Sequence, residues 1–287
     1  MARLNWQRSS ALATESRNPR SLGLDKMSAH DIVRLMNDEE FAVLRALKSA
    51  EMPLAVAAER AAEAFQAGGR IIYVGAGTSG RIASADAAEM PPTFGIDADR
   101  FVALVAGGTT AQDRSVEDAE DDVFASITAL NDMGVTRKDI VIGIAASGST
   151  PFVVSAVNHA RQKGIWTCGI ANNRGAALLQ AADHAILLDT GPEVLTGSTR
   201  LKAGTSQKLA LNRISTVAMV LSGKVIENLM VDVKAKNQKL KERCVRIVCD
   251  LTSATRDEAW DLLEANQWNI REVIDSVREP ETSGMAR

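Results

Sequence analysis

The sequence predicts an α/β fold, a doubly wound and mostly parallel sheet with a helical N-terminal lead-in and a small C-terminal helical domain. Five short apolar runs in the middle of the chain are typical of strands buried on both faces. Helical periodicity follows these runs, which is the order expected for a parallel sheet covered by helices. We expect a main domain over residues 1–235 and a three-helix domain with a disordered tail over residues 236–287.

The helical lead-in covers residues 28–67. Apolar residues such as Ile32 and Leu35 recur there at helical spacing, and Ser28 and Pro53 stand where helices begin. Two helical segments are therefore expected before the first strand.

The five predicted strands follow the lead-in. They cover residues 71–74, 101–106, 139–146, 164–171 and 184–189. A long helix is expected from about Thr199 to Leu229, where Leu, Ala, Lys and Val are frequent. Three short helices are expected from about Lys239 onward, with Trp260 and Trp268 as aromatic anchors.

Composition limits the classes of function. Of 287 residues, 46% are apolar and 24% charged, with a net charge of −3, so neither nucleic acid nor an anionic membrane is expected as a partner. No apolar run reaches the about 20 residues of a membrane span, and the N-terminus lacks the apolar core of a signal peptide. The three cysteines form no CxxC pair, so neither a disulfide framework nor a metal site is expected. These features predict a cytoplasmic protein that acts on a small molecule.

A glycine-rich turn follows the first predicted strand. Gly75, Gly77 and Gly80 match the GxGxxG pattern between a strand and a helix, which alone is a weak signal for dinucleotide binding. Such binding needs an acidic residue at the end of the second strand, but residues 101–106 continue into two glycines and two threonines. We therefore expect no nicotinamide or flavin, and no other cofactor.

Hydroxyl side chains occur in this turn and again in a second one. The SGST run at residues 147–150 follows the third strand and precedes a helix that Pro151 opens. Two such turns can hold one phosphate monoester with hydroxyls and with backbone N–H groups at helix N-termini. Neither turn has the lysine of a P-loop, so a nucleoside triphosphate is not expected. The alternative is that the hydroxyls only cap the two helices. The candidate phosphate ligands are Gly77, Thr78, Ser79, Ser147, Ser149 and Thr150.

These motifs carry a resemblance to a known family. VGAGTSG at 74–80 and ASGSTPF at 146–152 are similar to the sugar isomerase domain, a doubly wound phosphosugar-binding fold. With four further segments, the chain resembles the N-acetylmuramic acid 6-phosphate etherases over nearly its whole length. These segments are TESRNPRSLGLD at 14–25, DAAEMPPTFG at 86–95, VEDAEDD at 116–122 and TGSTRLKAGTSQKLALNRIST at 196–216. Met90 stands where the family has a cysteine, and NNRGAAL at 172–178 departs from a proline-containing loop.

The resemblance implies a reaction. The D-lactyl ether of N-acetylmuramic acid 6-phosphate is cleaved by elimination and water addition, giving N-acetylglucosamine 6-phosphate and D-lactate. It also implies a homodimer, in which the TESRN segment could complete a neighbouring subunit's site. Two alternatives use the same fold: a sugar phosphate isomerase, and a non-catalytic sugar phosphate sensor such as the glucokinase regulatory protein.

Two carboxylates are assigned from the resemblance. Glu89, directly before Met90 and Pro91, is implied as the general acid that protonates the departing lactate; we expect Pro91 to end its helix. Glu117 and Glu120 are three apart and would share a helix face, so the residues alone leave the choice between them open. The resemblance favours Glu120 as the base at carbon 2, and the roles of Glu89 and Glu120 could be interchanged.

Two more residues are candidates for substrate binding. Lys202 could pair with the phosphate or the lactyl carboxylate, although a solvated cation at a helix start is nearly as good an interpretation. Glu193 lies where related sugar isomerases keep an acid near the sugar.

Overall fold

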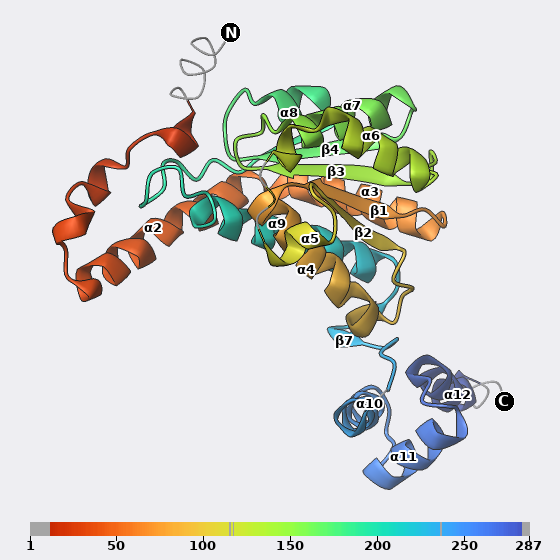
Figure 1. Cartoon of the computed structure of the whole chain (residues 1–287). Coiled ribbons are helices and arrows are strands. Elements are labelled where there is room, and N and C mark those ends of the chain that lie inside the picture. Colours follow the sequence, from red (N-terminus) through yellow and green to blue (C-terminus); the bar gives the residue numbers. More distant parts are fainter. Residues whose placement is uncertain (1–11, 115, 117, 236, 283–287) are drawn as a thin grey trace. The chain divides into compact units, whose positions relative to one another are not determined.

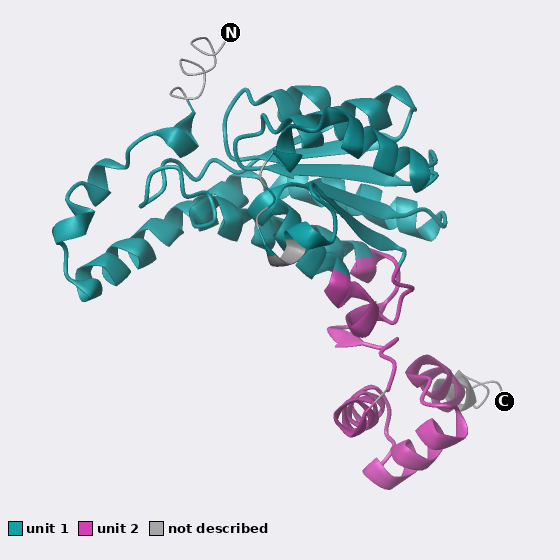
Figure 2. Ribbon diagram, in the orientation of Figure 1, with its two compact units in different colours: residues 1–87, 99–218 teal, residues 88–98, 219–287 magenta. Residues whose placement is uncertain are grey.

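The computed structural model describes residues 12–114, 116, 118–235 and 237–282 (Figure 1). The chain divides into two compact units, residues 1–87 with 99–218, and residues 88–98 with 219–287 (Figure 2). The domain boundary expected at residue 235 stays a prediction. The tail expected to be disordered includes residues 283–287, which lie outside the described residues.

The lead-in consists of short turns followed by two helices, as predicted. Three 3-10 turns come first: η1 (Ala13–Glu15), η2 (Pro19–Ser21) and η3 (Leu24–Lys26). They are followed by α2 (Ala29–Ser49) and α3 (Glu51–Gln66). The hydroxyl of Ser28 accepts a hydrogen bond from the N–H of Asp31 at 3.1 Å, which caps α2 as the sequence indicated.

Five parallel strands form one sheet in the part of the chain that the structure describes. They are β1 (Ile71–Gly75), β2 (Phe101–Val105), β3 (Ile140–Ala145), β4 (Trp166–Ala171) and β5 (His184–Leu187). Their order is β2-β1-β3-β4-β5, and every neighbouring pair is parallel. Both β1 and β3 are buried at every position, which explains their continuous apolar sequence. The predicted doubly wound α/β fold is confirmed.

Helices cover the sheet and connect its strands. They are α4 (Gly77–Phe94), α5 (Thr110–Asp113), α6 (Val123–Asp132), α7 (Pro151–Gln162), α8 (Ala177–Ala181) and α9 (Lys202–Leu221), with one 3-10 turn, η4 (Ala119–Asp121). On one face, α7 and α8 pack over β3 and β4, and α6 packs against α7 (Figure 1). The core there places Phe152, Val153 and Leu178 against Ile72 and Val141.

Two expected helix ends are wrong. Pro91 does not end α4, which continues through Pro92 to Phe94. A proline removes its own N–H and its ring crowds the carbonyl four residues back, but the carbonyl of Pro91 still accepts from the N–H of Gly95 at 3.0 Å. The helix ends at Gly95, whose φ of +66° is the left-handed conformation that glycine favours.

The helix expected over 199–229 is shorter, because α9 covers only Lys202–Leu221. Gly223 adopts φ +73°, and its N–H reaches back to the carbonyl of Val220 at 3.1 Å. A short antiparallel pair follows, β6 (Val225–Ile226) with β7 (Leu229–Met230).

The last part of the chain folds into three helices, α10 (Gln238–Leu251), α11 (Arg256–Ala265) and α12 (Ile270–Thr282). Thr255 and Glu258 form a capping box at the start of α11. Trp260 and Trp268 contact each other edge to face, with ring centroids 5.0 Å apart. No helix among the described residues is long and apolar enough to cross a membrane.

Candidate active site

The two hydroxyl-bearing turns follow the carboxyl ends of the neighbouring strands β1 and β3. Strand β1 pairs with β2 on one side and β3 on the other, so the strand order reverses between β1 and β3. Gly75 at the end of β1 is in register with Ile144 near the end of β3. Ligands of open α/β sheets bind at the carboxyl ends of the strands at such a reversal. The candidate site is therefore built by the turns after β1 and β3.

The glycines of the first turn are needed for different structural reasons. A Cβ on Gly75 would meet the backbone nitrogen of Gly80 at 2.7 Å, and one on Gly80 would meet the side chain of Val105 at 2.6 Å. These two glycines let the helix pack closely on the strands. Gly77 has φ +53°, is exposed, and has open space where a Cβ would stand. It begins α4 with its backbone accessible to a ligand.

The first turn presents N–H groups at the start of α4. The N–H of Gly80 bonds to the carbonyl of Ala76 at 3.2 Å, so the N–H groups before it have no carbonyl one turn back. Thr78 is half-buried, whereas Ser79 is buried and its hydroxyl donates to Gln207 Oε1 at 2.8 Å. The turn thus offers backbone donors and the partial positive charge of a helix N-terminus.

In the second turn, the hydroxyl of Ser147 is available to donate a hydrogen bond to a ligand. Ser147 Oγ accepts from the N–H of Ser149 at 3.2 Å and from its hydroxyl at 3.1 Å. Among the described residues no acceptor takes the Ser147 hydroxyl hydrogen. Thr150 precedes α7 but makes no side-chain capping bond, so it does not play the capping role that was the alternative.

Glu120 follows β2, the strand beside β1. It is exposed and lies in η4, a single 3-10 turn that packs against α7. Glu120 lies outside any longer helix, because Asp118 has φ +66° and Asp122 caps the next helix, α6. The helix face expected to be shared with Glu117 stays a prediction. Glu117 itself lies outside the described residues.

Glu89 lies on α4, in the second compact unit, and its side chain is exposed.

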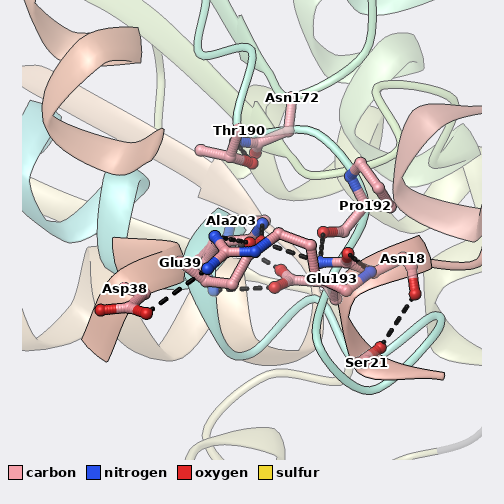
Figure 3. Close-up of polar contacts among 11 residues, drawn as sticks. Asn18, Ser21, Asp38, Glu39, Asn172, Thr190, Pro192, Glu193 and Ala203 are labelled. Atoms are coloured by element: carbon pink, nitrogen blue, oxygen red, sulfur yellow. Dashed lines mark hydrogen bonds and ion pairs between the residues drawn. The ribbon is translucent and has the colours of Figure 1, made fainter. Parts of the chain in front are cut away.

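Lys202 and Glu39 form a buried ion pair. Figure 3 shows Glu39 and Asn18 among the polar contacts of this part of the site. Lys202 Nζ lies 2.5 Å from Glu39 Oε2, which also accepts from Asn18 Nδ2 at 2.8 Å. Arg20 Nη1 donates to Glu39 Oε1 at 2.8 Å. Burial raises the pKa of Glu39, but the hydrogen bonds from Lys202 and Asn18 and the charges of Lys202 and Arg20 outweigh it, so the pKa lies below its ordinary value. The amine predicted to bind substrate has an internal partner in this structure.

Glu193 is fully buried and caps α9. Its two oxygens accept from the backbone N–H groups of Lys202 at 3.0 Å and Ala203 at 2.9 Å. Burial raises the pKa of this carboxyl above its ordinary value, against the opposing effect of the two N–H groups and of the Lys202 charge. A carboxylate in this place fixes the start of α9 and the direction of the Lys202 side chain.

Comparisons with known folds agree with this architecture. The model of the glucokinase regulatory protein N-terminal SIS domain matches residues 53–161, and the SIS domain model matches residues 123–214. A putative phosphosugar isomerase involved in capsule formation from Bacteroides fragilis is 21% identical with a TM-score of 0.51, over 69% of this chain and 93% of that one. A phosphoheptose isomerase from Neisseria gonorrhoeae is 19% identical with a TM-score of 0.50, over 68% and 98%. These structures show the fold.

Sequence relatives decide the family. Proteins named N-acetylmuramic acid 6-phosphate etherase from Geobacillus thermodenitrificans and Yersinia pestis are 48% and 46% identical to this chain. One from Actinobacillus pleuropneumoniae is 43% identical, and each alignment covers 92% of this chain and 87–90% of the relative. The chain belongs to the N-acetylmuramic acid 6-phosphate etherase family. The resemblance seen in the sequence and the expected carbon–oxygen lyase class are thereby confirmed, and the isomerase and sensor alternatives are not favoured.

Three polar residues beside the two turns, Asn172, Asn173 and Gln207, were not identified as site residues from the sequence. Asn173 Nδ2 donates to Thr14 Oγ1 and to the carbonyl of Ala146, both at 2.9 Å, so the TESRN segment is held beside the second turn. Gln207 and Asn172 bond to each other beneath the first turn. The signal that could have found the asparagines is their position directly after the apolar run of β4. Met90, where the etherase motif has a cysteine, is a buried apolar side chain.

Proposed function

We propose that the protein cleaves the D-lactyl ether of N-acetylmuramic acid 6-phosphate at the carboxyl ends of β1 and β3. The observation that carries this proposal is the adjacency of two strand-to-helix turns that both offer donors to a phosphate. The N–H groups of Gly77, Thr78 and Ser79 and the hydroxyls of Ser147 and Thr150 hold the phosphate, with Ser149 supporting Ser147. A phosphosugar held there leaves its sugar free to extend toward the segment after β2.

The chemistry is an elimination followed by an addition. In the open-chain sugar the aldehyde at carbon 1 acidifies the hydrogen on carbon 2, and the carboxylate of Glu120 removes that proton. The electron pair forms a double bond between carbons 2 and 3, while the bond from carbon 3 to the lactyl oxygen breaks. Glu89 gives its proton to this oxygen, and D-lactate leaves. Water then adds at carbon 3 and a proton returns to carbon 2, which gives N-acetylglucosamine 6-phosphate.

The resemblance to the etherases implies a homodimer, and Glu89 is exposed and so accessible to a second copy. We propose that Glu89 of one copy acts on the substrate whose phosphate is held by the turns of the other copy.

Glu193 and Lys202 take a supporting part in this proposal. Glu193 holds the start of α9, and Lys202 with Glu39 anchors the segment that contains Asn18. The amine of Lys202 is buried and paired with Glu39, so in this proposal Lys202 supports the fold around the site. We keep the cytoplasm as the expected location, since lactyl sugar phosphates are charged metabolites.

The proposed function is tested by lactate release. Purified protein is incubated with N-acetylmuramic acid 6-phosphate and, separately, with unphosphorylated N-acetylmuramic acid, and D-lactate is measured with a coupled dehydrogenase. We expect lactate from the phosphorylated sugar and far less from the other, because the turns bind through the phosphate. Conversion of the sugar without lactate would indicate an isomerase, and binding without any conversion would indicate a sensor.

A further inference from the structure

A chain of buried hydrogen bonds connects the first turn to the segments after β4 and β5. Ser79 Oγ donates to Gln207 Oε1 at 2.8 Å, and Gln207 Nε2 donates to Asn172 Oδ1 at 3.0 Å. Asn172 Nδ2 donates to the carbonyl of Leu188 at 2.8 Å and to Ser206 Oγ at 2.9 Å. The residues whose side chains form these hydrogen bonds are no more than 7% exposed. These groups are therefore largely shielded from bulk solvent.

The donor and the acceptor of every hydrogen bond in this series follow from the bond to the Leu188 carbonyl. A backbone carbonyl can only accept, so the amide of Asn172 must turn its nitrogen to Leu188 and its oxygen to Gln207. Gln207 must then turn its nitrogen to Asn172 and its oxygen to Ser79. An amide oxygen can only accept, so the hydroxyl of Ser79 must donate. Ser206 fits the same direction, because it accepts from Asn172 and donates to the carbonyl of Ala203 at 2.7 Å.

This assignment of donors and acceptors limits how Ser79 can bind a phosphate. A hydroxyl has one hydrogen, and that of Ser79 is committed to Gln207. A phosphate monoester dianion has only acceptor oxygens, so the Ser79 hydroxyl has no donor left for it. The backbone N–H of Ser79, in the first turn of α4, remains available. The bond to Gln207 thus ties the phosphate turn to α9 without contacting the ligand.

We propose that Gln207 is a positioning residue of the phosphate turn, and that Ser79 binds phosphate through its backbone N–H alone. Gln207 holds the Ser79 side chain, which holds the first turn of α4 in the place where its N–H groups converge on the phosphate. This inference deepens the proposed function and rests on its phosphate turn. It assigns to Gln207 and Asn172 a role in affinity for the phosphate and none in the chemical steps.

The test measures phosphate recognition separately from turnover. Calorimetry gives the affinity for N-acetylglucosamine 6-phosphate and for N-acetylglucosamine, and lactate assays give kcat and KM. Gln207→Met removes the hydrogen bonds to Ser79 and to Asn172. Loss of the bond to Ser79 is expected to weaken binding of the 6-phosphate about tenfold. KM is expected to rise by the same factor while kcat stays within about twofold. The matched control is Gln162→Met, at the exposed end of α7, which is expected to change neither.

A double-variant comparison separates positioning from direct contact. If the Ser79 hydroxyl affects phosphate binding only through its bond to Gln207, Ser79→Ala and Gln207→Met together weaken binding no more than Gln207→Met alone. Additive effects would mean a direct bond from the Ser79 hydroxyl and would overturn the inference. A wild type that binds the two sugars equally would also contradict the inference.

Because calorimetry needs no turnover, failure of the etherase reaction leaves this readout unaffected. Folding of every variant is checked by its thermal midpoint before binding is compared.

Discussion

Lys202 Nζ lies 2.5 Å from Glu39 Oε2, and the two side chains are 3% and 10% exposed. The pair joins α2 to the first residue of α9 over a sequence separation of 163 residues. Arg20 and Asn18 also bind Glu39, so the TESRN segment depends on the same carboxylate. One acid therefore holds together three segments that carry family motifs or lie next to them.

Removal of one member of this pair is expected to destabilise the fold strongly. Lys202→Met leaves the Glu39 carboxylate with Arg20 and Asn18 only, and Glu39→Gln leaves a buried ammonium unpaired. Each change is expected to lower the free energy of unfolding by about 3–5 kcal/mol, measured by urea denaturation. The control is Arg60→Met, which breaks the exposed pair with Glu63 and is expected to cost less than about 0.5 kcal/mol. Equal effects at both sites would contradict the buried pair's importance.

A second buried acid predicts how stability depends on pH. Asp139 is 3% exposed and accepts from the N–H and guanidinium of Arg70 and from the N–H of Thr136. Burial raises the pKa of Asp139, but these hydrogen bonds and the Arg70 charge outweigh it and hold the pKa below its ordinary value. A lowered pKa in the folded state means that the carboxylate stabilises the protein above its ordinary pKa of 3.8, and that this contribution is lost as pH falls through the lower folded value.

Asp139→Asn tests this sign. Urea denaturation of wild type and variant between pH 7 and pH 2.5 is expected to show a constant difference in unfolding free energy at and above about pH 5. The difference is expected to shrink as the pH falls below 3.8. A difference that grows toward acid would contradict the lowered pKa of Asp139.

The proposed exchange of Glu89 between copies predicts recovery of activity from two inactive variants. Glu89→Ala and Glu120→Ala subunits are mixed in equal amounts and allowed to exchange partners. If Glu89 serves the other copy's site, half of the dimers are mixed and each mixed dimer has one intact site of its two. About a quarter of the wild-type lactate release is then expected. Each variant mixed with itself is the control, and no recovery in the mixed sample would place both carboxylates in one chain's site.

Much of the fold was predictable because it depends on local pattern. Strands β1 and β3 are buried on both faces, so their sequences are apolar without interruption, and the turns after them were visible as Gly, Ser and Thr before helices. Helix ends were less predictable. Pro91 was expected to end its helix, but α4 continues to Phe94 and Gly95 ends it.

The polar residues around the site were not predictable from spacing. Ser79 and Gln207 are 128 residues apart, and Glu39 and Lys202 are 163 apart, so no periodicity connects them. Their partners depend on which strand ends the topology brings together. Glu120 was found through the family motif, whereas its place in a 3-10 turn follows from the left-handed Asp118 and the capping Asp122.

The central claim is that Glu120 removes the carbon 2 proton and Glu89 protonates the departing lactate. The most direct measurement incubates N-acetylmuramic acid 6-phosphate in deuterated water with wild type, Glu89→Ala and Glu120→Ala, and follows D-lactate together with deuterium at carbon 2. Both side chains are exposed, so both variants are expected to fold. Wild type is expected to release lactate, Glu89→Ala to exchange carbon 2 without releasing it, and Glu120→Ala to do neither. Exchange at carbon 2 that persists in Glu120→Ala would contradict the claim.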